Sequence, residues 1–315
     1  MGEGDVQLGK FFTKSTLLLF CLICMWGVSW PIYKQAVPYT PPLLFAGLRA
    51  LIGGLLLLAV LLKSRSEIRW RENWAKYCIS AFFNVILFFG LQTFGLIYLP
   101  GGLFSVLVYF QPVLLGLFAW MWLGEQMTPL KIMGLIIGFA GIIIVSVDGL
   151  TVHISAIGVI LGLLTALGWA FGVIYVKKVS REVNAYWMVG MQFTIGGAFL
   201  VGTGTIFESW AAIEWNGILI FGILFGATIG IPIAYSIYYS LVNAGEASKV
   251  GSFTFLVPII SVLIGTIFLD EPMTYMLFVG LLLVGISIYF VNYRGKRLQH
   301  FLSYSQKVKE NKEII

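Results

Sequence analysis

A single arginine, Arg49, is the most informative polar residue in this sequence, because it lies inside an apolar stretch of helical length. A charge within a membrane span costs at least about 2.5 kcal/mol and normally faces a cavity or a partner. A guanidinium can hold a carboxylate or a phosphate through two parallel hydrogen bonds. Arg49 is therefore a candidate anchor for an anionic solute. The alternative is a structural arginine that bonds helix-end carbonyls and extends toward the surface.

Aromatic and amide side chains inside the other apolar runs form a second set of candidates. Most Trp and Tyr residues near span ends anchor the membrane interface, but Trp26 and Trp169 each lie well within their runs. They favour an aromatic wall around an apolar or aromatic solute. Buried amides are equally compatible with packing between helices. The candidate substrate-binding residues are Arg49, Trp26, Trp30, Gln111, Trp169, Gln192, Tyr235 and Tyr238.

The parts of an enzyme are missing from the sequence. No Asp or Glu lies deep in an apolar run, and His153 and His300 stand alone. Cys21 and Cys24 have the C-x-x-C spacing but no second pair, so we expect buried thiols rather than metal or redox chemistry. We therefore expect no catalytic residue, no metal and no cofactor.

The composition indicates an integral membrane protein. Hydrophobic residues make up 59% of the 315 residues, charged residues only 11%, and the mean hydropathy is +0.94. A soluble domain has about 25% charged residues. The net charge of +6 resides mainly in loops and the C-terminal tail, which indicates contact with lipid headgroups rather than with nucleic acid.

The apolar runs predict an all-α membrane protein with ten transmembrane helices. A hydrocarbon core about 30 Å thick needs roughly 20 apolar residues per helix. With both termini cytoplasmic, 18 of the 20 Lys and Arg residues fall on the inner side, as expected for a protein of the cell membrane. The expected spans are 15–37, 42–62, 75–95, 101–122, 128–147, 154–176, 184–206, 216–241, 248–269 and 273–292.

An internal repeat divides these spans into two halves. Pro112, Glu125 and Gly134 recur as Pro258, Glu271 and Gly280, 146 positions later, and the segment 26–34 aligns with 169–177. Five helices per half is an odd number, so the second half must enter the membrane from the opposite side. We therefore expect inverted repeats around a shared pathway. The expected divisions are a cytoplasmic leader (1–14), two five-helix repeats (15–150 and 151–292) and a cytoplasmic tail (293–315).

Several residues near helix ends have either a structural or a gating role. The two repeated glutamates are expected at helix N-termini, where a carboxylate caps amides. The two prolines each remove one helical hydrogen bond, which predicts either a kink beside a cavity or a harmless bend. A lysine at the outer end of the first span either extends to the surface or has a gating role in the pathway. These residues are Lys34, Pro112, Glu125, Pro258 and Glu271.

The order of these features resembles the EamA-type transporters of the drug/metabolite transporter superfamily. The resemblance rests on the pattern Pro-x12-Glu-x8-Gly in both halves, on Trp26-Gly27 and on Arg49, and it covers about residues 15–292. It implies a ten-helix bundle that exports small metabolites such as amino acids, or exchanges solutes across the cytoplasmic membrane.

A secondary transporter working by alternating access is therefore the favoured hypothesis. The expected partners are a small-molecule substrate, an amino acid or another metabolite, and the lipid bilayer. One chain suffices to form the pathway, and the sequence leaves the oligomeric state undecided. The alternative is a channel-like or receptor protein without a coupled transport cycle; a channel would favour rings of like polar groups around a wide pore.

Overall fold

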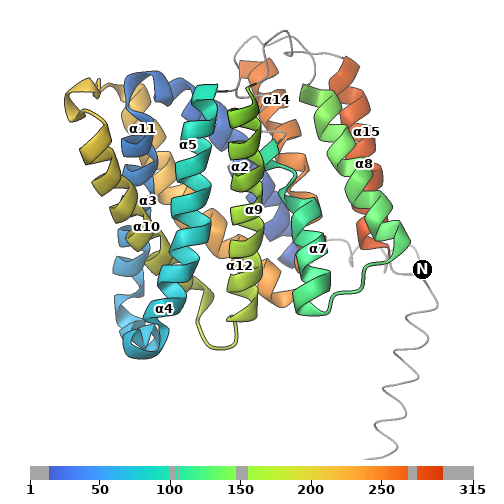
Figure 1. Ribbon diagram of the computed structural model, residues 1–315, viewed down its shortest axis with the longest axis horizontal. Coiled ribbons are helices and arrows are strands. Elements are labelled where there is room, and N and C mark those ends of the chain that lie inside the picture. Colours follow the sequence, from blue (N-terminus) through green and yellow to red (C-terminus); the bar gives the residue numbers. More distant parts are fainter. Residues whose placement is uncertain (1–13, 99–103, 105–106, 147–154, 269–274, 294–315) are drawn as a thin grey trace, which may run out of the picture.

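The computed structural model describes residues 14–98, 104, 107–146, 155–268 and 275–293, and every regular element in this part is a helix (Figure 1). The leader 1–13, the tail 294–315 and Glu271 lie outside the described residues. The α-helices are α2 (Lys14–Ala36), α3 (Pro42–Leu61), α4 (Trp70–Ala81), α5 (Phe88–Tyr98), α7 (Gln111–Leu123), α8 (Pro129–Ser146), α9 (Ala156–Lys178), α10 (Ala185–Phe207), α11 (Gly217–Phe225), α12 (Ala234–Ala244), α13 (Ala247–Phe253), α14 (Leu256–Phe268) and α15 (Tyr275–Asn292).

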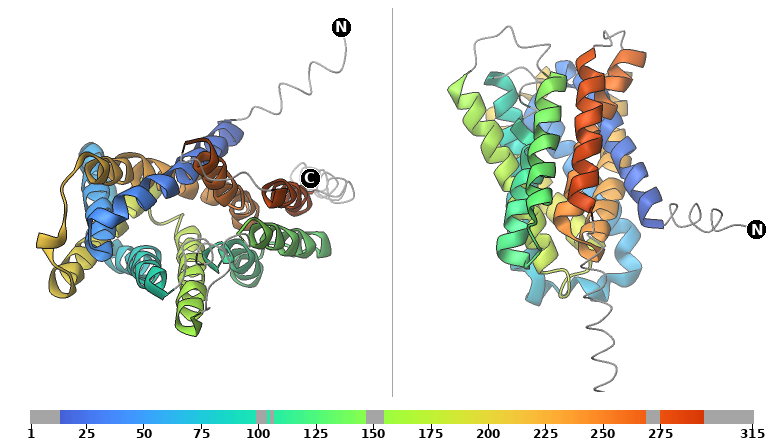
Figure 2. Two further views of the ribbon diagram at one scale, coloured as in Figure 1. Left: turned by 90° about the horizontal axis from the view of Figure 1, so that it is seen from above. Right: turned by 90° about the vertical axis from the view of Figure 1, so that its right-hand side faces the viewer.

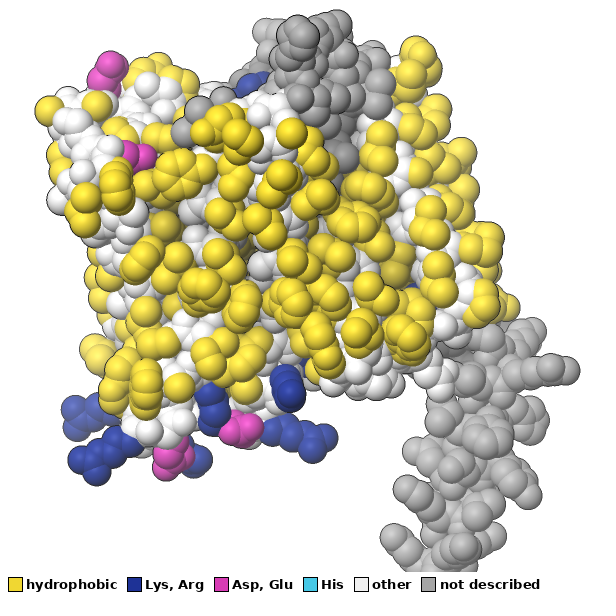
Figure 3. Space-filling view, in the orientation of Figure 1, with side chains coloured by type: hydrophobic (Ala, Val, Ile, Leu, Met, Phe, Trp, Pro, Cys, Tyr) yellow, Lys and Arg dark blue, Asp and Glu magenta, His cyan; other side chains and the backbone are white. Residues whose placement is uncertain are grey.

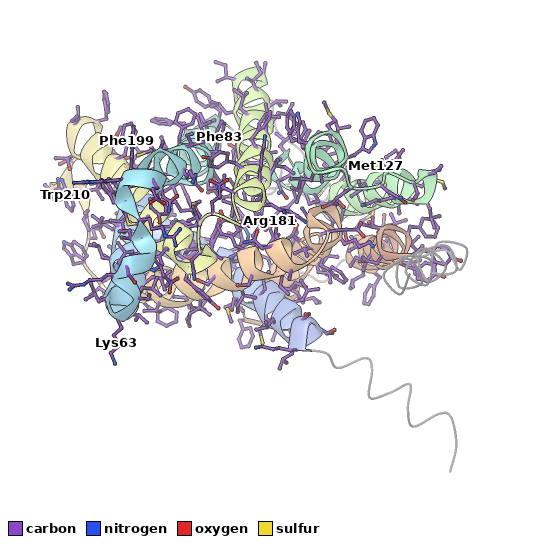
Figure 4. The ribbon with its side chains drawn as sticks, turned by 90° about the horizontal axis from the view of Figure 1, so that it is seen from below. Lys63, Phe83, Met127, Arg181, Phe199 and Trp210 are labelled. Carbon is purple, nitrogen blue, oxygen red and sulfur yellow. The ribbon has the colours of Figure 1, made fainter. Side chains whose placement is uncertain are left out.

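The lengths of the helices and the residues on their surface match a membrane environment. Six continuous helical stretches are long and apolar enough to cross a bilayer, and four shorter apolar helices accompany them: Gln111–Leu123, Pro129–Ile144, Ala247–Ser261 and Phe278–Asn292. Apolar side chains cover the middle of the visible face, and Lys and Arg gather at one end (Figure 3). At that end the Lys63 side chain extends away from the bundle (Figure 4).

Two antiparallel helix pairs lie at opposite ends of the elongated bundle, α3 with α10 and α8 with α15 (Figures 1 and 2). In both pairs, residue numbers rise along one helix as they fall along the other. In each pair the two partners are also the repeat equivalents of one another in sequence. The neighbours are Leu44 and Gly204, Gly47 and Val201, Leu51 and Gly197, Gly54 and Thr194, Leu58 and Gly190 in the first pair, and Gly134 and Phe290, Gly138 and Ser287, Gly141 and Leu283 in the second.

The α3–α10 pair depends on glycine at its closest approach. A Cβ atom added to Gly197 would lie 2.3 Å from the Leu51 backbone nitrogen, and one added to Gly54 would lie 2.5 Å from the Thr194 nitrogen. Small residues allow such contacts between membrane helices, where close packing replaces the hydrophobic effect. Gly54 and Gly197 are repeat equivalents, so the same contact is made twice.

We expect Gly197→Leu to reduce the yield of folded, monodisperse protein in detergent and to lower its melting temperature by several degrees, because overpacking costs about 1–3 kcal/mol or more. Gly202→Leu is the matched control on the same helix, since a Cβ atom at Gly202 meets nothing within 4 Å. Equal stability of the two variants in a thermal denaturation series would contradict this description of the α3–α10 contact.

Two further irregularities also recur in both halves. The chain is π-helical at Phe82–Leu87 and at Gly226–Ile233, and these segments correspond at the repeat offset. It also turns at Tyr109 and Phe110 before α7, and at Thr254 and Phe255 before α14. π-helical turns and interrupted membrane helices are frequent at binding sites.

The repeated prolines act differently from the prediction. Pro112 and Pro258 were expected to kink or bend a continuous helix, but each lies in the first turn of a new helix, directly after a break. Proline is tolerated there because the first-turn N–H has no intrahelical acceptor. The interruption of the membrane helix therefore precedes the proline.

Candidate functional site

The aromatic residues predicted on separate spans meet in one buried cluster. The Trp26 ring centroid lies 5.9 Å from that of Trp169, 5.2 Å from that of Tyr235 and 5.1 Å from that of Tyr238. Edge and tilted contacts of this kind are favourable for aromatic rings. The cluster joins the repeat-related helices α2 and α9 to α12, so both halves contribute to it.

Trp30 extends this cluster through a tyrosine. The Trp30 indole N–H donates a 3.0 Å hydrogen bond to the Tyr109 hydroxyl, and the Tyr109 ring centroid lies 6.5 Å from that of Trp169. Tyr109 stands at the turn before α7, so the broken helix reaches the aromatic cluster. Tyr109 is not among the substrate-binding residues predicted from the sequence; its place two residues before Gln111-Pro112 was the available signal.

Arg49 is packed among aromatic rings beside the cluster. Its side chain is buried, 6% exposed, and its guanidinium carbon lies 3.9 Å from the Tyr33 ring centroid and 4.3 Å from that of Phe45. Its Nε donates to the Phe45 carbonyl at 3.3 Å. Ring faces attract a desolvated cation. No carboxylate of the described residues lies within 4 Å of Arg49, so this end of the site carries a positive charge.

The π-helical segment Gly226–Ile233 connects Arg49 with the aromatic cluster. Trp26 donates its indole N–H to the Gly230 carbonyl at 3.4 Å. Gly226 and Gly230 leave no room for a Cβ atom, since one would meet the Arg49 side chain or the Tyr33 hydroxyl. Arg49 and Trp26 therefore flank the same irregular stretch of backbone.

Gln192, the repeat equivalent of Arg49, has a different environment. Its amide oxygen accepts a 2.5 Å hydrogen bond from Ser80, and its amide nitrogen donates to the Tyr239 hydroxyl at 3.1 Å. Asn84 continues this buried chain by donating to Ser80 at 3.2 Å. These bonds join α10 to the neighbouring helices, so the geometry favours a packing role for Gln192 over contact with a solute.

Gln111 is placed differently again. It is the first residue of α7 and fully buried, yet neither of its amide atoms has a hydrogen-bond partner. Its amide faces the Tyr238 hydroxyl within interaction range, but the two groups do not reach the geometry of an ordinary hydrogen bond. The structure thus brings Gln111 to the aromatic cluster.

Glu125 occupies the centre of a charged cluster at the basic end of the bundle. Gly124 ends α7 with a φ of 68°, which turns Glu125 back toward the other half. The carboxylate accepts from the backbone N–H groups of Ala247 (2.5 Å) and Ser248 (3.2 Å) and from the Ser248 hydroxyl. Glu125 therefore caps the start of α13, in the other half, rather than the start of α8, which follows it.

Lysines complete this cluster. Lys177 lies 3.3 Å and Lys131 3.6 Å from the Glu125 carboxylate, and Lys131 also contacts Glu246 at 3.1 Å. Lys177 donates in addition to the Gly245 carbonyl. Burial raises the pKa of Glu246, but hydrogen bonds and charges from Lys249 and Lys131 outweigh burial and hold the pKa below its ordinary value. The cluster fastens α7, α9 and α13 together.

From the sequence, these lysines predict only the orientation of the chain in the membrane. Lys177 is the repeat equivalent of Lys34, which the structure places at the exposed outer end of α2. Glu208 was also missed as a cap: its carboxylate oxygens accept from Leu43 at 2.9 Å and Leu44 at 2.8 Å, at the start of α3. A carboxylate directly after an apolar run was the available signal for it.

The fold and this site define a multi-pass membrane transporter. The profile of the EamA-like transporter family matches residues 13–147 and again 156–293. The chain belongs to the EamA-like transporter family. The resemblance drawn from the sequence is thereby confirmed, and the family consists of transporters rather than enzymes.

Individual relatives agree with this assignment. The chain is 50% identical over 290 residues to the uncharacterized transporter YvbV of Bacillus subtilis strain 168, covering 92% of this chain and 94% of that protein. It is 24% identical over 298 residues to a probable amino-acid metabolite efflux pump of Escherichia coli K12, covering 90% and 96%. A crystal structure with 18% identity shares the fold, with a TM-score of 0.79 over 90% of this chain and 98% of that one.

Proposed function

We propose that the protein is a secondary transporter of the cell membrane that moves a small carboxylate-bearing metabolite, such as an amino acid or a related solute, by alternating access. The observation that carries this proposal is Arg49, a buried cation with no described carboxylate partner, beside an aromatic cluster shared by both halves. A guanidinium in a low-dielectric site binds a carboxylate strongly. The name of the Escherichia coli relative supports an amino-acid-like substrate.

The architecture in this proposal is ten spans in two inverted five-helix repeats, with both termini cytoplasmic. The antiparallel contacts of α3 with α10 and of α8 with α15 support it, because repeat equivalents that run in opposite directions are what inversion requires. The repeated π-helical segments and broken helices support it as well. The basic side chains at one end support a cytoplasmic assignment for that end. One chain holds the whole pathway.

The Glu125 cluster serves as the cytoplasmic gate in this mechanism. It joins the ends of α7, α9 and α13, which must separate before a solute in the aromatic cluster reaches the cytoplasm. Its repeat equivalents are Lys34 and Glu271; Glu271 lies outside the described residues, so the gate proposed here is the cytoplasmic one alone.

Uptake into proteoliposomes separates this proposal from a channel. A single binding site predicts flux that saturates with solute concentration and that unlabelled amino acids inhibit competitively. A channel-like protein predicts flux that rises linearly without competition. Liposomes without the protein give the background.

A further inference from the structure

Three polar groups at the centre of the molecule lack the hydrogen bonds that buried groups normally make. They are the Gln111 amide, the Tyr238 hydroxyl and the Trp169 indole N–H, with side chains 0%, 0% and 3% exposed. A buried polar group left without a hydrogen bond destabilises the folded protein. Elsewhere in the same protein, the buried amide of Gln192 is bonded at both ends. Asn84, Ser236, Asn243 and Ser287 carry the other such atoms among the described residues, so the gathering of three at one aromatic cluster is what points to a bound molecule.

The three groups come from three helices in both halves, and the rings of Trp169 and Tyr238 contact Trp26. Gln111 begins α7 and lies near the Tyr238 hydroxyl on α12. Trp169 on α9 has its ring centroid 6.4 Å from that of Tyr238. Trp26 touches both rings, at 5.9 and 5.1 Å, while its indole N–H faces Gly230 on the side of Arg49.

We infer that Gln111, Tyr238 and Trp169 form a second substrate subsite, which recognises an uncharged polar group such as a hydroxyl or a carboxamide. The set offers donors on all three side chains and acceptors on Gln111 and Tyr238, and none of the ion pairs or cation–π contacts of the described residues involves it. Such a set matches a neutral group that both donates and accepts. The inference rests on the proposed function: the substrate places its carboxylate at Arg49, an apolar or aromatic body against Trp26, and a polar end at Gln111.

Competition between matched solutes tests the subsite. The probes are three pairs in which one member adds a polar side-chain group: L-tyrosine with L-phenylalanine, L-threonine with L-valine, and L-glutamine with L-methionine. A site that hydrogen-bonds a substrate group discriminates against the analogue that lacks it. In the wild-type protein, the polar member of at least one pair should inhibit uptake about 10-fold more strongly than its partner.

Gln111→Leu and Tyr238→Phe should each bring that ratio close to one, while inhibition by the apolar member stays unchanged. The unchanged inhibition shows that the variants are folded. Tyr186→Phe is the control, because Tyr186 is exposed at the cytoplasmic end of α10.

Two results would overturn the inference. One is that the wild-type protein discriminates between the members of no pair. The other is that the ratio of inhibition by the polar and apolar members persists in both variants, which would mean that the polar groups bind water and not the substrate. Absence of saturable uptake for every solute would instead refute the proposed function, and the subsite with it.

Discussion

Arg49→Gln is expected to lower the transport efficiency for carboxylate-bearing solutes by at least about 10-fold, since a hydrogen bond to a charged group contributes about 1.5–3 kcal/mol. The guanidinium is buried among the rings of Tyr33 and Phe45, with no described carboxylate nearby. A glutamine keeps a polar end but removes the charge and the second parallel hydrogen bond. The loss should appear as a raised KM in proteoliposome uptake.

Two comparisons separate binding from folding in this experiment. Arg49→Lys keeps the charge but not the paired geometry, so it should retain intermediate activity. An amidated derivative of the same solute lacks the carboxylate, so its uptake should differ little between the wild-type protein and Arg49→Gln. Unchanged KM for the carboxylate-bearing solute, with normal yield of the variant, would remove Arg49 from the binding site.

Glu125→Ala is expected to open the end of the bundle that we propose to be cytoplasmic. The substitution leaves Lys131 and Lys177, with side chains 4% and 17% exposed, without their shared carboxylate, and it uncaps α13. Removing one partner of a buried ion pair costs about 3–5 kcal/mol. If that cost applies only to the closed arrangement, the equilibrium shifts toward the cytoplasm-open form by about 100-fold or more.

The measurement is thiol labelling from the cytoplasmic side in a background without Cys21, Cys24 and Cys78. Leu115→Cys is the reporter, because Leu115 is buried and packs against Gly251 of α13. Its labelling rate in inside-out vesicles should rise at least 10-fold with Glu125→Ala. Glu208→Ala removes a cap at the other end of the bundle and should leave that rate unchanged. Equal rates in all three proteins would rule out Glu125 as the cytoplasmic gate.

Much of the architecture was predictable because membrane helices have a strong composition signal. Apolar runs and the repeat of Pro112-Glu125 as Pro258-Glu271 predicted an all-helical, duplicated transporter. The meeting of Trp26 with Trp169 followed from their equivalent positions in two halves that share a pathway. Periodicity and duplication therefore give both the class of protein and its most central aromatic pair.

The contacts between helices could not be predicted from the sequence. Whether a buried amide is satisfied depends on which side chain the neighbouring helix presents, so Gln111 and Gln192 looked alike in sequence but differ in structure. A helix cap supplied by another half of the chain, as Glu125 supplies to α13, has no local pattern. Pro112 and Pro258 were expected within continuous helices, but each lies at the start of a helix. Proline is compatible with both a kink and a helix start, so its presence alone does not distinguish them.

Counterflow across a proteoliposome membrane tests most directly whether one site is reached from each side in turn. Vesicles are loaded with a high concentration of an unlabelled substrate amino acid and diluted into a trace of the labelled form. Alternating access predicts a transient accumulation of label above its equilibrium level, abolished by Arg49→Gln. Alternating access would be contradicted if the label entered only to its equilibrium level and at a rate that does not depend on the internal solute.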